Sequence, residues 1–310
     1  MISRKEFLKK AGYFAAGSAL TPLASSKLMD KLSPPDITIL YTNDTHARLD
    51  PFPENSTEFA GLGGITRRAS LVKKVRAHEK NVLLLDAGDV FQGTPWFDVY
   101  GGSVDLKLMT EMQYDAMAVG NHEFDRGPDG FAEAAKKAGF PILAANYEVS
   151  ETPMNPYVQR YVIRELSGFR IGIFGLGIRL DGVVPKELYG DVQYRNPEIW
   201  SRGLVRSLKE FHRCDYIICL SHLGYSYPDN RIDDLKLAER IDGIDFIIGG
   251  HTHTFLDAPT TVSKSDNSNT YVTQMGHSGV RLGRVDLRFN NNSPKPDAKF
   301  QYYTIGEPVA

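Results

Sequence analysis

The sequence predicts a single large α/β domain, and three observations support this fold class. Short apolar runs alternate along the chain with segments whose apolar residues recur at helical spacing. The 310 residues are many for one ordinary domain and few for two full ones. A hydrophobic fraction of 42%, a charged fraction of 24% and a formal net charge of -2 are typical of a soluble globular protein with a substantial core. No block of like charge indicates a nucleic-acid binding patch.

The first 26 residues have the three regions of an export signal. Residues 3–10 are largely basic, residues 11–20 are small and apolar, and residues 24–26 provide the small side chains that a signal peptidase requires. The pattern is similar to a twin-arginine leader with Lys5 in place of the second arginine, and its apolar stretch is too short for a permanent membrane anchor. A frayed amphipathic helix is the alternative interpretation. We expect an export signal over residues 1–26, a linker over 27–36, a catalytic domain over 37–310, and a periplasmic or cell-envelope location.

Five short apolar runs have the pattern of buried strands, and each is followed by polar residues that can bind metals. The runs are residues 37–41, 81–85, 116–119, 216–220 and 246–248. Ligands of α/β sheets bind outside the carboxyl ends of the strands, so these polar side chains are expected in one cleft. They are Asp44, His46, Asp89, Asn121, His122, His222, His251 and His253. The remaining histidines that we interpret as ordinary surface or core residues are His78, His212 and His277.

The turn after the third run predicts proton chemistry beside a metal. Asn121 offers an amide oxygen to a cation, and His122 can carry a proton. Asp125 is close enough in sequence to hold the His122 imidazole in one tautomer. Asp89 follows Gly88, whose backbone freedom permits a sharp turn, so the Asp89 carboxylate can lean over the sheet edge and bridge two cations.

Two further pairs are each separated by a single position. Asp44 and His46 are expected to face the same way in extended chain, and so are His251 and His253. Seven of the eight clustered residues are therefore placed to bind two divalent cations. Mixed imidazole and carboxylate ligands suit zinc, manganese, iron or cobalt without selecting one.

Two predicted helices flank these strands. The helix after Gly64 is expected to bury one face and to expose a basic one. The apolar face consists of Ile65, Ala69, Val72 and Val75, and the solvated face of Arg67, Arg68, Lys73 and Lys74. A second helix is capped by Asn196, and its expected core positions are Trp200, Leu204, Leu208 and Phe211.

Together these motifs resemble the signature of calcineurin-like metallophosphoesterases. The motifs are Asn43-Asp44-Thr45-His46, Gly88-Asp89, Gly120-Asn121-His122-Glu123, His222 and Gly250-His251-Thr252-His253. Residues 88–95 and 114–127 are similar to the catalytic domain of 5'-nucleotidases in particular. The resemblance extends from about residue 37 to about residue 289 and implies a four-layer αββα sandwich of the dinuclear metallophosphoesterase type.

The resemblance also implies a division of the metal ligands and a reaction. One metal would be held by Asp44, His46, Asp89 and His253. The other would be held by Asp89, Asn121, His222 and His251. A hydroxide bridging the two metals would hydrolyse a phosphomonoester, while His122, oriented by Asp125, would stabilise the developing charge or protonate the leaving oxygen.

The resemblance leaves the substrate open. Two-domain members of the family continue into a C-terminal domain that binds the nucleoside base between aromatic rings, and we expect this chain to lack it. The substrate would be a nucleotide or another phosphate ester. The alternatives are a broad phosphodiesterase or phosphomonoesterase, and a catalytic subunit that needs a separate base-binding partner protein.

Overall fold

The computed structural model describes residues 34–265, 268–290 and 295–308. The predicted export signal, residues 1–26, lies outside the described residues, and so does the predicted linker up to residue 33. Within the described ranges, no helix is both long and apolar enough to cross a membrane.

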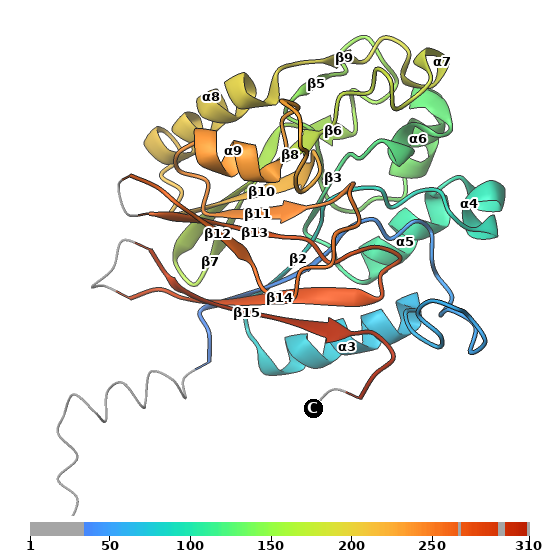
Figure 1. The fold of residues 1–310 in the computed structure, drawn as a ribbon, viewed down its shortest axis with the longest axis horizontal. Coiled ribbons are helices and arrows are strands. Elements are labelled where there is room, and N and C mark those ends of the chain that lie inside the picture. The colour runs from blue at the N-terminus through green and yellow to red at the C-terminus, as the bar shows by residue number, and fades with distance from the viewer. Residues whose placement is uncertain (1–33, 266–267, 291–294, 309–310) are drawn as a thin grey trace, which may run out of the picture. The chain divides into compact units, whose positions relative to one another are not determined.

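Two large sheets organise the chain from Asp36 onward (Figure 1). The first has the strand order β15 (Asp297–Thr304), β14 (Arg281–Arg288), β1 (Ile37–Thr42), β2 (Val82–Asp86), β3 (Ala116–Ala118), β4 (Ile142–Leu143) and β6 (Val158–Gln159). The second has the order β12 (Thr260–Ser263), β13 (Asn269–Thr273), β11 (Phe246–Gly249), β10 (Tyr216–His222), β8 (Phe169–Gly177) and β7 (Tyr161–Leu166). A small ribbon pairs β5 (Tyr147–Glu148) with β9 (Gln193–Tyr194).

The central strands of both sheets are parallel, which brings their carboxyl ends to one edge. β1 runs parallel to β2 with Ile39 opposite Leu83, and β10 runs parallel to β11 with Leu220 opposite Ile248. All four of these side chains belong to the core between the two sheets. Alternate residues of the same strands point to the outer faces, because side chains in a strand alternate with a period of two.

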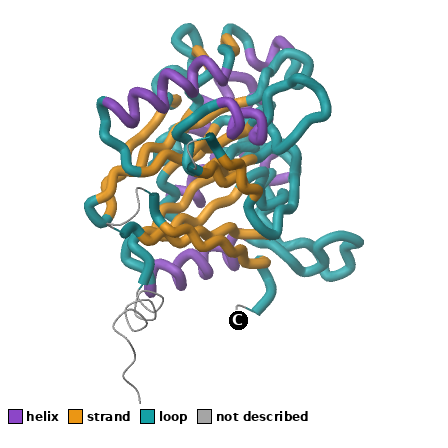
Figure 2. The backbone as a smooth tube through the Cα atoms, turned by 60° about the vertical axis from the view of Figure 1, so that its left-hand side comes forward, coloured by secondary structure: helices purple, strands orange, loops and turns teal. Residues whose placement is uncertain are grey.

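Helices cover those outer faces and complete four layers. The helices are α3 (Ile65–His78), α4 (Pro95–Tyr100), α5 (Ser103–Glu111), α6 (Gly127–Ala135), α7 (Lys186–Tyr189), α8 (Pro197–Glu210) and α9 (Asp234–Arg240), with a 3₁₀ turn η1 (His122–Phe124). α3, α5 and α6 contribute to one outer core with Leu40 and Leu84, while α8 and α9 pack on Ile217 and Ile247. Figure 2 shows the strands between the helices. The predicted α/β sandwich is confirmed.

Two predictions about helix faces were wrong. Arg68 is buried with only 3% of its surface exposed, because it lies one turn after Ile65 on the same face of α3. The carboxyl groups of Asp86 and Asp105 are close enough to interact with its charge. Phe211 is 78% exposed, because it is the residue that caps the end of α8 instead of a member of its buried face.

The second helix therefore presents a different face to the core from the one predicted. Its buried residues are Pro197, Ser201, Val205 and Leu208, whereas Trp200 and Leu204 are only partly buried. The Asn196 cap was predicted correctly, since its side-chain oxygen accepts hydrogen bonds from the backbone N–H groups of Glu198 and Ile199.

Candidate metal centre

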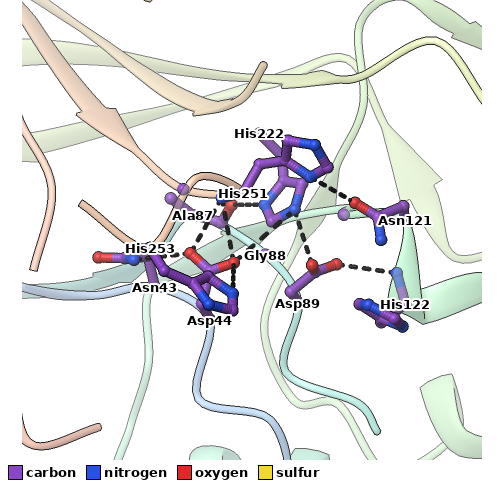
Figure 3. Close-up of polar contacts among 12 residues, drawn as sticks. Asn43, Asp44, Ala87, Gly88, Asp89, Asn121, His122, His222, His251 and His253 are labelled. Atoms are coloured by element: carbon purple, nitrogen blue, oxygen red, sulfur yellow. Dashed lines mark hydrogen bonds and ion pairs between the residues drawn. The ribbon is translucent and has the colours of Figure 1, made fainter. Parts of the chain in front are cut away.

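The carboxyl ends of the five predicted strands bring the predicted metal-binding residues together (Figure 3). Six of them form two groups, and within each group the ligand atoms lie within 4.8 Å of one another. We call Asp89, His222 and His251 the inner trio, and Asp44, His46 and His253 the outer trio. Asn121 joins the inner trio, since its Oδ1 lies 2.7 Å from Nδ1 of His251.

The inner trio is enclosed by protein. His222 is fully buried and Asp89 is 2% exposed. Nδ1–H of His222 donates a hydrogen bond to the carbonyl oxygen of Ala87 at 2.8 Å, which leaves Nε2 with its lone pair directed into the site. Nε2 lies 3.0 Å from Oδ2 of Asp89 but is not in hydrogen-bond geometry with it.

The outer trio reaches solvent through His253, while Asp44 and His46 are buried. The side chain of His253 is 41% exposed, and its Nε2 lies 3.3 Å from Oδ1 of Asp44 and 2.9 Å from Nε2 of His46. The other ring nitrogen of His46, Nδ1, is 3.1 Å from the carbonyl oxygen of Phe91. That contact fixes the ring and turns Nε2 toward the trio.

These donors fit two divalent cations. Nε2 of His222 is buried and has no hydrogen-bond partner, which is unfavourable unless a cation satisfies it. The facing Nε2 atoms of His46 and His253 converge as ligands of one ion would. Imidazole and carboxylate donors are the set expected for first-row transition metals.

Backbone conformation, not strand alternation, aims these side chains. Positive φ angles, rare outside glycine, occur at five of the candidate metal-binding residues: Asp44 (49°), His46 (49°), Asp89 (54°), His251 (72°) and His253 (53°). The expectation that the Asp44–His46 and His251–His253 pairs lie in extended chain was therefore wrong. Because the chain turns sharply at each pair, His251 reaches the inner trio while His253 reaches the outer one.

Opposite charges inside the centre perturb its acids and bases. Burial alone would raise the pKa of Asp89, but the adjacent His222, His122 and His46 hold that pKa below its ordinary value. Burial alone would lower the pKa of His222, and the charges of Asp89 and Asp44 raise it instead. Burial and the neighbouring charge of His222 lower the pKa of His251 to about 4. The carboxylates thus attract positive charge into the centre, and a bound cation would take the place of the proton on His222.

The predicted proton carrier lies beside the metal residues. Nδ1 of His122 is 2.9 Å from Oδ2 of Asp125, and its backbone N–H donates to Oδ1 of Asp89 at 2.8 Å. The His122 ring lies 5.3 Å from the His46 ring, measured between centroids. About a third of the His122 side chain is exposed, so its free Nε2 is accessible to a bound molecule.

The sequence profile of calcineurin-like phosphoesterases matches residues 37–255. This chain belongs to that family. It is 36% identical over 282 residues to a snake venom 5'-nucleotidase of Naja atra, covering 83% of the chain and 51% of the relative. It is 32% identical over 303 residues to the human 5'-nucleotidase, covering 89% and 49%.

Solved structures agree with this family. The crystal structure of a 5'-nucleotidase precursor from Thermus thermophilus matches with a TM-score of 0.78 and 34% identity, over 87% of this chain and 54% of that one. The chain spans about half the length of these relatives. Its family and its 5'-nucleotidase relatives make it a metal-dependent phosphoester hydrolase.

One buried carboxylate of this phosphoesterase was not singled out by sequence reasoning. Glu123 is fully buried and accepts backbone N–H groups from Gly120 at 2.6 Å, Val90 at 2.8 Å and Asp89 at 3.0 Å. Burial and the charge of Asp89 raise its pKa to about 7. Glu123 therefore ties the turn that carries Asp89 to the turn that carries Asn121. Its place in the Gly-Asn-His-Glu motif was the signal available.

The close approach of those two turns also explains Gly120. A Cβ atom added at this position would lie 2.2 Å from Oδ1 of Asp89, where no side chain fits. A glycine is therefore required beside Asp89.

His277, interpreted from the sequence as an ordinary surface or core histidine, lies beside the outer trio. Its ring stacks on the ring of His253 with centroids 4.8 Å apart and an interplanar angle of 28°. Its pKa is lowered, first by burial and then by the neighbouring His253. Since the chain reaches His277 only after crossing β13, no local pattern could have linked it to the outer trio.

Proposed function

We propose that this phosphoesterase hydrolyses phosphomonoesters of nucleotides, the reaction class named by its 5'-nucleotidase relatives. The main observation in support of this proposal is the position of Asp89. One carboxylate oxygen faces His222, and the other accepts the backbone N–H of His122. Asp89 therefore connects the metal residues to a histidine that can transfer a proton.

The residues divide their roles as follows. Asp44, His46, Asp89 and His253 would hold one cation, and Asp89, Asn121, His222 and His251 the other. When bound, two such cations lower the pKa of water and neutralise charge on the phosphoryl oxygens. His122 stabilises or protonates the departing ester oxygen, and Asp125 keeps its ring in the tautomer that presents Nε2.

Burial alone would lower the pKa of His122, but the hydrogen bond to Asp125 and the charge of Asp89 raise it above its ordinary value. A pKa shifted in this direction favours the protonated ring, which suits a general acid. His122 is placed to act on the leaving group and is not among the assigned metal ligands.

The test is phosphate release by the metal-loaded chain from three substrates. AMP, a cyclic nucleotide and an aryl phosphate distinguish a nucleotidase, a phosphodiesterase and a general phosphomonoesterase. We expect AMP to give a higher kcat/KM than the cyclic nucleotide. The control is the same preparation after chelation and after metal is added back. Faster hydrolysis of the cyclic nucleotide would replace this proposal with a diesterase.

In one alternative, the chain is the catalytic subunit of a pair. A separate base-binding protein would then be needed for activity on AMP. Full hydrolysis of AMP by the isolated chain would exclude this alternative. Metal content is measured on the same samples, and we expect about two transition-metal ions per chain, with one ion or none contradicting the dinuclear assignment.

We also propose that the chain is exported and that its mature form begins after about residue 26. The support is the order of basic, apolar and small residues in the sequence. Sequencing the N terminus of protein recovered from the cell envelope tests it. Recovery of an intact Met1 from that fraction would contradict export with cleavage.

A further inference from the structure

Three aromatic rings lie beside the exposed metal residue His253, and none of them has been given a role above. They belong to Phe59, Phe255 and His277, which we call the aromatic platform. Phe59 is 5.6 Å from Phe255 and 5.4 Å from His277 between ring centroids, and Phe255 is 5.8 Å from His277. All three side chains are half-buried. The rings therefore contact one another and still present surface to solvent.

The platform is continuous with the outer trio. His277 stacks on His253 at 4.8 Å, so the platform begins at a metal residue and extends away from it. His253 is also the most exposed of the outer trio. A phosphate ester held at the metal residues would have its leaving group directed out of the centre, on the side where solvent reaches His253.

The loop that carries Phe59 is held in place by backbone hydrogen bonds. In Figure 1 this loop, residues 51–64, is the blue segment next to α3. The N–H of Phe52 donates to the carbonyl of Leu62 at 2.8 Å, and the N–H of Gly63 donates to the carbonyl of Ile305 at 2.7 Å. The ring of Phe52 adds a further contact with Phe59, at 5.5 Å between centroids.

Phe59 itself has an unfavourable backbone conformation. Its φ of 57° is rare for a bulky residue, because the side chain crowds the following carbonyl. Strain of this kind persists only where the surrounding structure enforces it, and it often marks binding sites. Here the enforced conformation places the Phe59 ring against Phe255 and His277.

We propose that the aromatic platform binds the planar base of the nucleotide by stacking while the phosphate lies at the metal residues. This inference rests on the proposed function. Nucleic-acid bases stack on aromatic side chains with little dependence on base identity, since every base has a π face. Phe59 would provide the main face, and His277 would connect the base site to the metal centre. The chain's own catalytic domain would then recognise the base.

The test compares AMP with ribose 5-phosphate, which has the same phosphate and sugar but no base. We expect Phe59→Ala to lower the ratio of kcat/KM for AMP to that for ribose 5-phosphate by about 5- to 100-fold. Phe59→Leu keeps an apolar side chain without a π face and should lower the ratio to a lesser extent. The matched control is Phe211→Ala, which removes an exposed ring at the end of α8 and should leave the ratio unchanged.

A binding measurement tests the platform without requiring that the protein catalyse a reaction. Saturation-transfer NMR with adenosine and zinc-loaded protein should show the strongest transfer to the base protons in the wild type and a loss of that transfer in Phe59→Ala. Thermal unfolding of each variant identifies one that has failed to fold, in which case Phe59→Leu supplies the comparison.

Two results would contradict the proposal that the aromatic platform binds the base. One is an equal loss of activity on both substrates, which would make Phe59 a support of the metal centre only. The other is unchanged base transfer in the folded variants. A wild type that hydrolyses neither substrate would instead contradict the proposed function. The adenosine measurement would still show whether the platform binds the base.

Discussion

The inner and outer trios use similar donors but are built differently. In the inner trio, His222 is fully buried and its ring is fixed by a backbone carbonyl. In the outer trio, 41% of the His253 side chain is exposed, and its ring is fixed by stacking on His277. Each trio has two buried members, and the difference lies in the third: His251 is only partly exposed, whereas His253 is exposed. The comparison teaches that His253 is the point at which a substrate in solution can reach the centre.

The largest effect is expected at Asp89, the carboxylate of the inner trio that we propose as a ligand of both cations. Asp89→Ala removes that carboxylate, so bound metal should fall from about two ions per chain to less than one. Activity should fall by roughly 10⁴-fold, because metal-assisted catalysis is lost along with the ions. Elemental analysis and phosphate release measure the two quantities. A variant that keeps both ions would show that Asp89 does not connect the trios.

His122→Ala is expected to have the next largest effect, and it separates chemistry from metal binding. Metal content should stay near the wild-type level, while kcat falls by roughly 10² to 10⁴, the usual contribution of a positioned proton donor. The kcat of Asp125→Asn should lie between those of the wild type and His122→Ala, because this substitution frees the His122 ring without removing it. An aryl phosphate with an acidic phenol should partly rescue His122→Ala. Loss of metal in this variant would make His122 a ligand.

Glu123→Gln should weaken metal binding at the inner trio more than at the outer trio. The carboxylate accepts N–H groups from Gly120, Asp89 and Val90, and an amide offers one acceptor oxygen where two are used. We expect a 10- to 100-fold loss of metal affinity or activity, as is usual for residues that orient ligands. Titration with zinc, following the two ions separately, measures it. An equal loss of affinity for both ions would show that Glu123 does not support the inner trio in particular.

The smallest effect is expected for Asp105, a buried carboxyl group outside both trios, and it concerns the pH dependence of the free energy of unfolding. Asp105 is 2% exposed, its Oδ2 has no hydrogen-bond partner, and burial raises its pKa to about 7 from 3.8. The folded chain therefore binds more protons than the unfolded chain between about pH 4 and pH 7. Its stability must fall as pH rises through that window.

Asp105→Asn removes this titration. We expect the variant to lose less stability than the wild type between pH 5 and pH 8, by about 2 kcal/mol, or roughly 4 to 8 °C in Tm. Thermal unfolding at the two pH values is the measurement. Because Asp105 is not in either trio, its metal content should match the wild type. Parallel pH curves for both proteins would show that Asp105 is ionised in the folded state.

Local patterns predicted the strands well. The five runs that lead into metal residues became β1, β2, β3, β10 and β11, because buried parallel strands are continuous apolar segments bounded by turns. The edge strands β7 and β15 were not predicted. Their residues are mostly half-buried and mix charged with apolar side chains, so they lack such a run.

Charged and aromatic residues were harder to place from sequence. Arg68 is charged, as on a solvated helix face, yet it is buried close to the carboxyl groups of Asp86 and Asp105. Phe59 and His277 are separated by more than two hundred residues and meet only because the loop after β1 folds over the turn after β13. The export signal stays a prediction, since it lies outside the described residues.

The sequence by itself determined which residue types follow the buried strands, and hence that carboxylates and imidazoles lie at the strands' carboxyl ends, which the structure divides between two sheets. This is so because strand periodicity and turn chemistry are local properties of the chain. The residues alone left the division of these donors open, the family resemblance implied one, and only the tertiary structure groups them into two trios. His251 and His253 are two positions apart but belong to different trios, since left-handed backbone at both residues turns the chain between them. Such conformations cost energy locally and are maintained by contacts from distant segments, such as the N–H of His251 donating to Asp44.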